Sequence, residues 1–141
     1  MTVIGLGAAT GCLGKDDHGV ASAQRRWAAN APAAYQFHSR EVCFCPDELT
    51  REMIVDVRGG AVVAAIYADD GSPVGAATRG QILTVEGLFA LLADAVDRGA
   101  DQIDVTYDAA LGYPRTIALD YHRSAADDER GFTLSGLVAL P

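Results

Sequence analysis

Apolar residues at helical spacing predict a short first helix over residues 20–30. Val20, Ala23 and Trp27 recur at intervals of three and four residues, which places them on one face of a helix. We expect this helix to end before Pro32, because proline cannot continue a helix and restricts the residue before it. Trp27 is then the residue that anchors this helix in the core.

A longer helix is predicted from Thr84 to about Arg98. Thr84 can cap its N-terminus, and Gly99 can end it in a left-handed conformation. Glu86 lies in the first turn, where the helix dipole favours a negative charge. The apolar face of this helix comprises Val85, Leu88, Phe89, Leu92 and Val96.

Alternating apolar and polar residues predict six strands, since successive side chains of a strand point to opposite faces. Arg58-Gly59-Gly60 between two of them is typical of a tight hairpin, because glycine accepts a positive φ. Residues 69–80 have the composition of a loop. The predicted strands span residues 35–40, 53–58, 61–68, 102–107, 115–122 and 132–139.

The predicted order is one helix and three strands, followed by a second helix and three strands. Strands joined by hairpins, with helices at intervals, favour an antiparallel sheet with both helices on one face. The fold class is therefore α+β, in the order α-β-β-β-α-β-β-β. Residues 35–37 resemble 103–105, and residues 54–56 resemble 119–120 with their neighbours, which hints at two related halves.

The charge of the chain restricts its partners. Its 141 residues carry a formal net charge of −8, and Lys15 is the only lysine. Affinity for nucleic acid rests on Lys and Arg contacts with phosphates, so we expect no nucleic-acid partner. An acidic surface also disfavours anionic membranes, and no apolar run reaches the roughly 18–20 residues that span a bilayer. This length and composition indicate one globular domain, which we expect to be monomeric.

Residues 1–19 form a separate segment by composition. Residues 1–14 are small, apolar and uncharged, and Ala9-Thr10-Gly11-Cys12 resembles the end of a bacterial lipoprotein signal, whose cysteine becomes lipidated. The positive leader of such signals is missing, so we expect the true start to lie upstream. An ordinary Gly/Ala-rich N-terminus is the alternative. We predict lipidation at Cys12, a polar tether after it, and one α+β domain over residues 20–141 that is anchored in the cell envelope or secreted.

Cys43-Phe44-Cys45 is a candidate disulfide. In an extended strand the Cα atoms of the two cysteines lie roughly 6.5–7 Å apart, at or beyond the upper limit for a disulfide. Pro46 signals a nearby turn, which can close this gap. We predict a disulfide in an oxidising compartment, with two buried thiols as the alternative. A redox-active pair with His38 as base, or a zinc site of the same three residues without an evident fourth ligand, is the remaining interpretation.

Tyrosines and carboxylates gather in the last part of the chain. Asp108 is placed to start a turn and Gly112 to adopt a positive φ. We expect Asp108, Asp120 and the Asp127-Asp128-Glu129 run to meet at one end of the sheet. Such carboxylates could bind calcium, although their spacing matches no known ligand loop, or act as acid and base. A solvated turn with capping and arginine pairing is the structural alternative. The candidate binding surface comprises Tyr107, Asp108, Tyr113, Asp120, Asp127, Asp128 and Glu129.

Several segments together resemble a known family. They are Trp27, residues 35–37, Cys43-Phe44-Cys45, residues 55–60 and 84–92, Val105-Thr106-Tyr107-Asp108, Leu111-Gly112-Tyr113-Pro114, residues 117–120 and Asp127-Asp128-Glu129. In this combination and order, the chain from about Trp27 to Leu137 resembles the uncharacterised bacterial domain-of-unknown-function family 6174. The resemblance implies a small exported or lipid-anchored domain without an established activity, and it adds no chemistry.

Three functional hypotheses remain. The favoured one is a non-enzymatic, envelope-associated domain that binds a protein or a small-molecule ligand through its sheet face or acidic loops, or that has a structural role, without a cofactor. The second is an enzyme that uses the carboxylates of Asp108, Asp120 and residues 127–129, with or without calcium. The third is a thiol-redox protein that uses Cys43 and Cys45. The sequence contains no nucleophile-elbow, phosphate-loop or dinucleotide motif.

Overall fold

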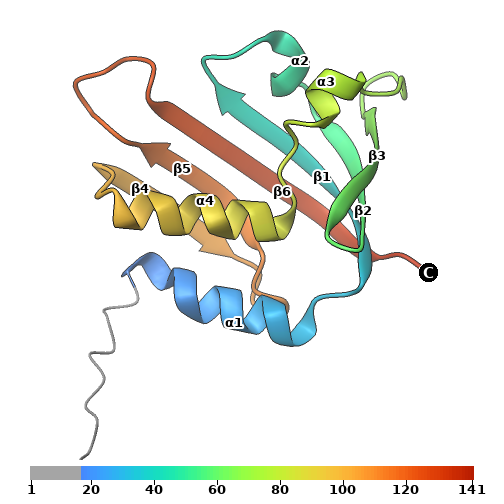
Figure 1. The fold of residues 1–141 in the computed structure, drawn as a ribbon, viewed down its shortest axis with the longest axis horizontal. Helices are drawn as coiled ribbons and strands as arrows, with labels where there is room; N and C mark the ends of the chain where they lie inside the picture. Colours follow the sequence, from blue (N-terminus) through green and yellow to red (C-terminus); the bar gives the residue numbers. More distant parts are fainter. Residues whose placement is uncertain (1–16) are drawn as a thin grey trace, which may run out of the picture.

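The computed structural model describes residues 17–141 (Figure 1). The predicted leader, including Cys12, lies outside these residues. None of the helices in the described part of the chain has the length and apolarity needed to cross a bilayer. The elements in chain order are the 3₁₀ turn η1 (Asp17–Gly19), α1 (Val20–Asn30), β1 (Ala34–Cys43), α2 (Asp47–Thr50), β2 (Met53–Arg58), β3 (Ala61–Tyr67), α3 (Ala76–Arg79), α4 (Val85–Asp97), β4 (Gln102–Tyr107), β5 (Pro114–Asp120) and β6 (Glu129–Ala139).

The strands of the described chain form one antiparallel sheet in the order β3-β2-β1-β6-β5-β4. At the centre, β1 pairs with β2 on one side and with β6 on the other, so that Tyr35 lies between Val57 and Ala139. Each half of the chain contributes three neighbouring strands, and the first strand of one half meets the last strand of the other. The predicted α+β class and antiparallel sheet are confirmed.

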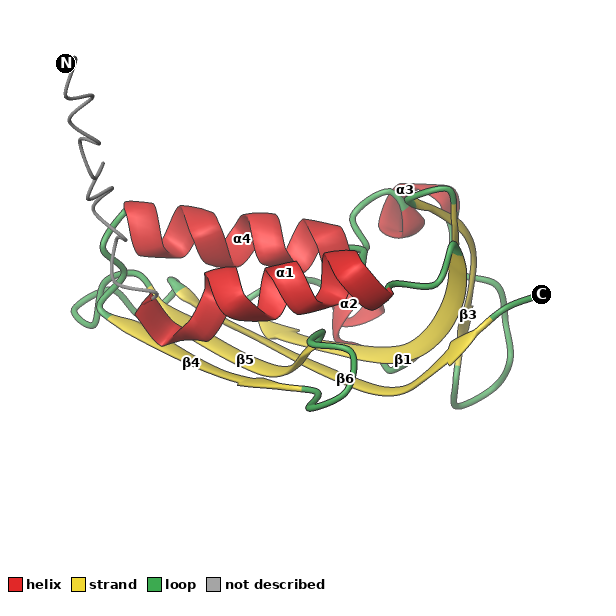
Figure 2. Ribbon diagram, turned by 90° about the horizontal axis from the view of Figure 1, so that it is seen from below, coloured by secondary structure: helices red, strands yellow, loops and turns green. Residues whose placement is uncertain are grey.

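α1 and α4 lie over the same face of the sheet (Figure 2). Thr84 Oγ1 accepts a hydrogen bond from the backbone N of Gly87 at 3.0 Å, which confirms the predicted cap of α4. The apolar face of α4 meets alternate residues of the strands, because every second side chain of a strand points to the same face. The buried side chains of this layer include Val85, Leu88, Phe89, Leu92, Tyr35, Phe37, Val55, Val57, Ile117, Leu119, Phe132 and Leu134.

Trp27 anchors α1 in the core, as the helical spacing predicts. Its side chain is 3% exposed, and its ring meets that of Tyr35 edge-on at 5.2 Å. Trp27 Nε1 donates to one carboxylate oxygen of Glu86 at 3.2 Å, and the Tyr35 hydroxyl donates to the other at 2.9 Å. Glu86 therefore joins α1 and α4 to β1. Burial raises the pKa of Tyr35 well above its ordinary value, and the hydrogen bond to Glu86 adds to the rise.

β1 and β6 extend further than the sequence pattern predicts. β1 continues past Arg40 to Cys43, and β6 begins at Glu129 instead of Phe132. The two extensions pair with each other, with Val42 opposite Gly131. Each extension is stabilised by the backbone of the other, so alternation within either segment alone does not reveal it. The short helices α2 and α3 also fall in segments that the pattern assigns to connections.

Candidate functional site

The face of the sheet opposite the helices carries a groove of about 890 Å³ over β4, β5 and β6. Its floor is the cross-strand pair of Ala118 and Gly131, whose small size leaves space above the backbone. The intervening Ile117, Leu119 and Phe132 are buried in the core, because side chains alternate along a strand. The volume lies within the range of roughly 300–1,000 Å³ that is usual for small-molecule sites.

Three threonine hydroxyls border one side of this floor. Thr116 lies opposite Thr106 on β4 and opposite Thr133 on β6, and all three side chains are exposed. The Oγ1 atoms of Thr106 and Thr116 are 2.6 Å apart and share a hydrogen bond. The row supplies hydrogen-bond donors and acceptors without adding charge.

Val42 and Phe44 form an apolar wall on the β1 side of the groove. Their side chains are 65% and 86% exposed, and both line the groove. Cys43 and Cys45 flank Phe44 with their Cα atoms 5.3 Å apart, which is disulfide distance. This separation is shorter than that of an extended chain, because β1 ends at Cys43 and the chain bends there. The Cys43–Cys45 pair therefore holds Phe44 in a small closed loop at the rim.

Carboxylates occupy the third border of the groove. Asp120 and Glu129 are register partners in β5 and β6, so their side chains leave the same face of the sheet. Asp120 is only 8% exposed, and its Oδ1 has no hydrogen-bond partner among the described residues. Asp104, which lies opposite Ala118, adds a third carboxylate toward the β4 edge. The groove thus combines a polar row, an apolar wall and a negative end.

A smaller pocket of about 360 Å³ lies beyond the acidic end and shares Phe44 and Glu129 with the groove. His122 Nδ1 and Asp128 Oδ2 share a hydrogen bond at 2.7 Å on its border, and Asp127 also lines it. Figure 1 shows that the β5–β6 loop and the connection from β1 to α2 lie at the same end of the sheet. The structure therefore brings the cysteine pair next to the predicted run of residues 127–129.

Asp108 does not join these carboxylates. In the β4·β5 ladder Tyr107 lies opposite Pro114 at one end, and Gln102 lies opposite Asp120 at the other. The length of β4 separates the two ends by about 20 Å. The expectation that Asp108 and Asp120 meet at one end is therefore wrong. A hairpin turn and the loop that follows its second strand necessarily lie at opposite ends of that strand.

The two tyrosines of the predicted surface pack inward instead. Tyr113 is 7% exposed, and burial raises the pKa of its hydroxyl, with a further rise from the charge of Asp108. The ring of Tyr107 stacks on that of Phe89 with centroids 6.4 Å apart, and its hydroxyl donates to the carbonyl oxygen of His18 at 3.0 Å. Tyr113 is a core residue, and Tyr107 packs η1 and α4 against the edge of the sheet.

The turn between β4 and β5 has the structure that its residues predict. Asp108 Oδ2 accepts hydrogen bonds from the backbone N of Ala110 at 3.1 Å and of Leu111 at 2.8 Å. Gly112 has a φ of 86°, and a Cβ at this position would lie 2.6 Å from the carbonyl oxygen of Ala23 in α1. The turn therefore packs directly on α1, and Asp108 and Gly112 serve the fold.

The redox and zinc interpretations of the cysteines require His38 beside them. His38 precedes Cys43 by five positions on β1, which is about 17 Å along the strand. An odd spacing also directs the two side chains to opposite faces of the sheet. His38 Nδ1 lies 3.7 Å from a carboxylate oxygen of Glu52 instead. In residues 17–141, no three His, Cys, Asp or Glu side chains converge closely enough to hold a metal ion.

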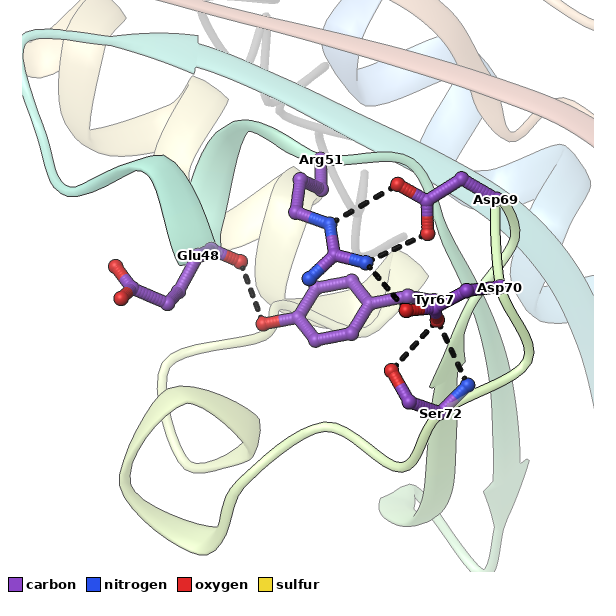
Figure 3. Close-up of polar contacts among 6 residues, drawn as sticks. All are labelled: Glu48, Arg51, Tyr67, Asp69, Asp70 and Ser72. Carbon is purple, nitrogen blue, oxygen red and sulfur yellow. Dashed lines mark hydrogen bonds and ion pairs between the residues drawn. The ribbon is translucent and has the colours of Figure 1, made fainter.

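A separate polar cluster near β3 has a structural role (Figure 3). The Arg51 guanidinium lies 3.6 Å from the centre of the Tyr67 ring and pairs with Asp69 at 2.6 Å. The hydrogen bond to Asp69 raises the pKa of Arg51. Hydrogen bonds from the Ser72 side chain and backbone lower the pKa of Asp70. These groups satisfy one another, none of them lines the groove, and they tie the segment before β2 to the loop after β3.

Sequence reasoning missed the floor and the wall of the groove. In residues 116–119, Thr116 and Ala118 point away from the helices. Two small residues at such positions indicate a depression in that face of the sheet. The signal is weak, because only the pairing with Gly131 places a second small residue beside Ala118. Phe44 entered the sequence argument only as the residue between two cysteines.

The groove lies within a domain that has been defined in other proteins. A family model described as a family of unknown function (DUF6174) matches residues 19–139. The chain belongs to this family. The match spans α1 to the end of β6, so the DUF6174 domain includes the floor, the wall and the acidic end of the groove. No curated protein and no solved structure matched the chain.

Proposed function

We propose that this DUF6174 domain is a non-enzymatic module of the cell envelope that binds a small-molecule ligand in the groove. The observation that carries the proposal is Asp120, a buried residue that lines the end of the groove and whose Oδ1 has no hydrogen-bond partner among the described residues. A buried polar atom without a partner costs about 1–3 kcal/mol. A ligand that donates a hydrogen bond to this oxygen removes that cost, so binding and stability are coupled at Asp120.

The composition of the groove supports binding of a compact ligand. Small-molecule sites combine an apolar surface with a few polar groups that fix orientation. Here Val42 and Phe44 supply the apolar surface, and the hydroxyls of Thr116 and Thr133 supply polar contacts. Phe44 is held by the neighbouring cysteine pair, so its ring is offered to a ligand at a reduced loss of conformational freedom.

Binding is favoured over catalysis by how the reactive groups are arranged. Cys43 and Cys45 lie at disulfide distance from each other, and a disulfide leaves neither sulfur free as a nucleophile. Asp120 and Glu129 are adjacent carboxylates on the same face, where a positive group would reduce their mutual repulsion. Asp108, another carboxylate of the enzyme hypothesis, belongs to the turn at the other end of β5.

Export to the envelope is supported by the cysteine pair and by the leader-like residues. Disulfides persist in oxidising compartments and are rare in reducing ones. Cys43 and Cys45 flank Phe44, whose side chain is 86% exposed, so cytosolic reductants would have access to this disulfide. The Ala9-Thr10-Gly11-Cys12 segment adds a candidate lipidation site at Cys12, outside the described residues.

A groove-filling substitution tests the proposed site. Ala118→Leu places a larger side chain on the groove floor at an exposed position, and Ala64→Leu makes the same change at an exposed position of β3 outside the groove. We expect a library of small neutral, cationic and anionic compounds to yield ligands that shift the amide resonances of Ala118, Gly131 and Thr133. Ala118→Leu removes these shifts and Ala64→Leu preserves them. Ligands that survive Ala118→Leu, or that are converted to products, contradict the proposal.

The envelope location has its own test. A gene that carries its natural upstream region is expressed with and without globomycin, and the protein is followed by fractionation and gel mobility. We expect globomycin to block processing, and Cys12→Ala to release the protein from the membrane fraction. An unchanged mobility and location of the Cys12→Ala variant would rule out the anchor.

A further inference from the structure

We infer that the ligand of the groove is a small organic cation, with one ammonium or guanidinium group attached to an aromatic or apolar body. This inference rests on the proposed function and names the class of ligand for the same groove. It follows from three features of the groove: the charges at its acidic end, the engagement of the nearby arginines elsewhere, and the distance from the carboxylates to the apolar wall.

Asp120 and Glu129, at the acidic end of the groove, form no ion pair with an arginine or histidine of the described residues. Asp120 and Glu129 lie directly opposite each other in β5 and β6, where like charges are destabilising. Asp120 is more than nine-tenths buried, and its Oδ1 accepts no hydrogen bond among the described residues. An ammonium or guanidinium group has only donors to offer, and it would satisfy this oxygen while it separates the two carboxylates.

The arginines closest to the groove are engaged elsewhere. Arg130 lies next to Glu129 and itself lines the groove, but its Nε donates to Glu41 at 2.7 Å and its guanidinium lies over the ring of Phe132 at 5.0 Å. Arg40 faces Thr133 across the β1·β6 ladder, and its Nε donates to a backbone carbonyl of residue 50 at 3.3 Å. The protein therefore supplies a cation to Glu41 and leaves the groove carboxylates for an external one.

The position of the apolar wall sets the shape of the ligand. Asp120 on β5 is two strands away from β1, which carries Val42 and ends one residue before Phe44. Strands lie about 4.8 Å apart, so the carboxylate and the wall are separated by about 10 Å across the floor. A cation with a short linker and a ring spans this distance. Its ring then packs on the exposed Phe44, where aromatic pairs add to simple burial.

Calcium fits these features less well than an organic cation. It takes six to eight oxygen ligands, whereas one border of the groove is formed by Val42 and Phe44. Calcium and an organic cation are both complementary in charge to the carboxylates, but only the organic cation can also pack on Val42 and Phe44. Calcium is therefore included as an arm of the test.

Calorimetric titration of the full chain with a matched set of probes tests the inference. The probes are phenethylammonium, the neutral 2-phenylethanol, the anionic phenylacetate and calcium chloride. The variants are Asp120→Asn, Glu129→Gln and, as control, Asp127→Asn, which changes a carboxylate that does not line the groove. Circular dichroism first establishes that each variant is folded.

We expect phenethylammonium to bind at least tenfold more tightly than 2-phenylethanol, and phenylacetate to bind more weakly than both. Asp120→Asn should weaken phenethylammonium at least tenfold, Glu129→Gln should weaken it less, and Asp127→Asn should leave it unchanged. Equal binding of the alcohol and the ammonium, or tightest binding of calcium, overturns the inference and leaves the proposed binding function standing. If none of the probes binds and the broader compound library also yields no ligand, both the inference and the proposed binding function are overturned.

Discussion

Asp120 and Glu129 lie opposite each other across the β5·β6 ladder, on the face of the sheet that α1 and α4 leave uncovered. Two carboxylates in this relationship repel each other, and one oxygen of Asp120 is buried without a partner among the described residues. A sheet selected for stability alone would place an opposite charge or a neutral group at one of these positions. At this pair, the proposed binding of a ligand would come at a cost in stability of the ligand-free domain.

Asp120→Asn should stabilise the ligand-free domain. The substitution removes the like-charge pair and provides an amide that can donate to Glu129, a gain of up to about 1 kcal/mol in the free energy of unfolding. Urea denaturation of the wild type and the variant measures the difference, with Asp127→Asn as control for the loss of one negative charge. A loss of stability in Asp120→Asn would show that the carboxylate of Asp120 is satisfied in the folded protein.

Gly112→Ala should lower the free energy of unfolding by more than the backbone strain of a positive φ accounts for. An alanine at φ 86° is strained, and its Cβ would also lie 2.6 Å from the carbonyl oxygen of Ala23. Gly60 has a φ of 76° with no atom within 4 Å of an added Cβ, so Gly60→Ala isolates the conformational part. We expect Gly60→Ala to cost about 1–2 kcal/mol and Gly112→Ala clearly more. Equal losses in urea denaturation would mean that α1 moves away from the turn without cost.

Tyr35→Phe should destabilise the domain at neutral pH. The Tyr35 hydroxyl donates to Glu86 and accepts a hydrogen bond from the buried backbone N of Val85 at 3.1 Å. Its removal leaves that N–H without its acceptor, which costs about 1–3 kcal/mol. Phe37 lies on the same strand and is also fully buried, so a phenyl ring without a hydroxyl is compatible with this core. Chemical denaturation at pH 7 measures the loss, and an unchanged stability would contradict the role of the hydroxyl.

The same tyrosine should make the domain sensitive to alkaline pH. Tyr35 has a raised pKa in the folded state, so above pH 10 the unfolded chain loses this proton first. The contribution of Tyr35 to stability is complete below pH 10 and falls as the pH rises toward its folded pKa, by up to about 1.4 kcal/mol per pH unit. The free energy of unfolding between pH 9 and pH 11 should fall less steeply in Tyr35→Phe. Parallel pH profiles would contradict the burial of this hydroxyl.

Cys43 and Cys45 should be oxidised in protein recovered from an oxidising compartment. Alkylation of the denatured, unreduced protein should leave both cysteines unmodified, and prior reduction should make both reactive. The loop that they close is very short, so chain entropy limits the stabilisation to roughly 1–2 kcal/mol. Paired Cys43→Ala and Cys45→Ala substitutions should therefore lower stability only modestly. Two freely alkylated thiols before reduction would exclude the disulfide.

Local pattern predicted the elements of this fold well, and pairing between distant segments decided the rest. Thr84, Gly59 and Gly60 act through their own turns and caps, so their roles follow from neighbouring residues. The outer parts of β1 and β6 exist because they pair with each other, and neither is evident alone. Local reasoning therefore found the helices and hairpins but placed the ends of the central strands short.

The candidate site shows the same division. Asp120 and Glu129 were both singled out as carboxylates near the end of a sheet, but only the register makes them partners. Asp108 is close to these residues in sequence, but it lies in the β4–β5 turn, at the opposite end of β5 from Asp120. The floor of the groove depends on the pairing of Ala118 in β5 with Gly131 in the neighbouring strand β6. Such coincidences of small residues are invisible until the register is known.

The most direct test of the account is a measurement of intermolecular nuclear Overhauser effects between phenethylammonium and the isotope-labelled protein. The account predicts contacts from the aromatic protons of the ligand to the methyl groups of Val42 and Ala118 and to the ring of Phe44, with loss of these contacts in Asp120→Asn. Contacts to side chains of α1 or α4 instead, or contacts to the groove that persist unchanged in Asp120→Asn, would contradict it.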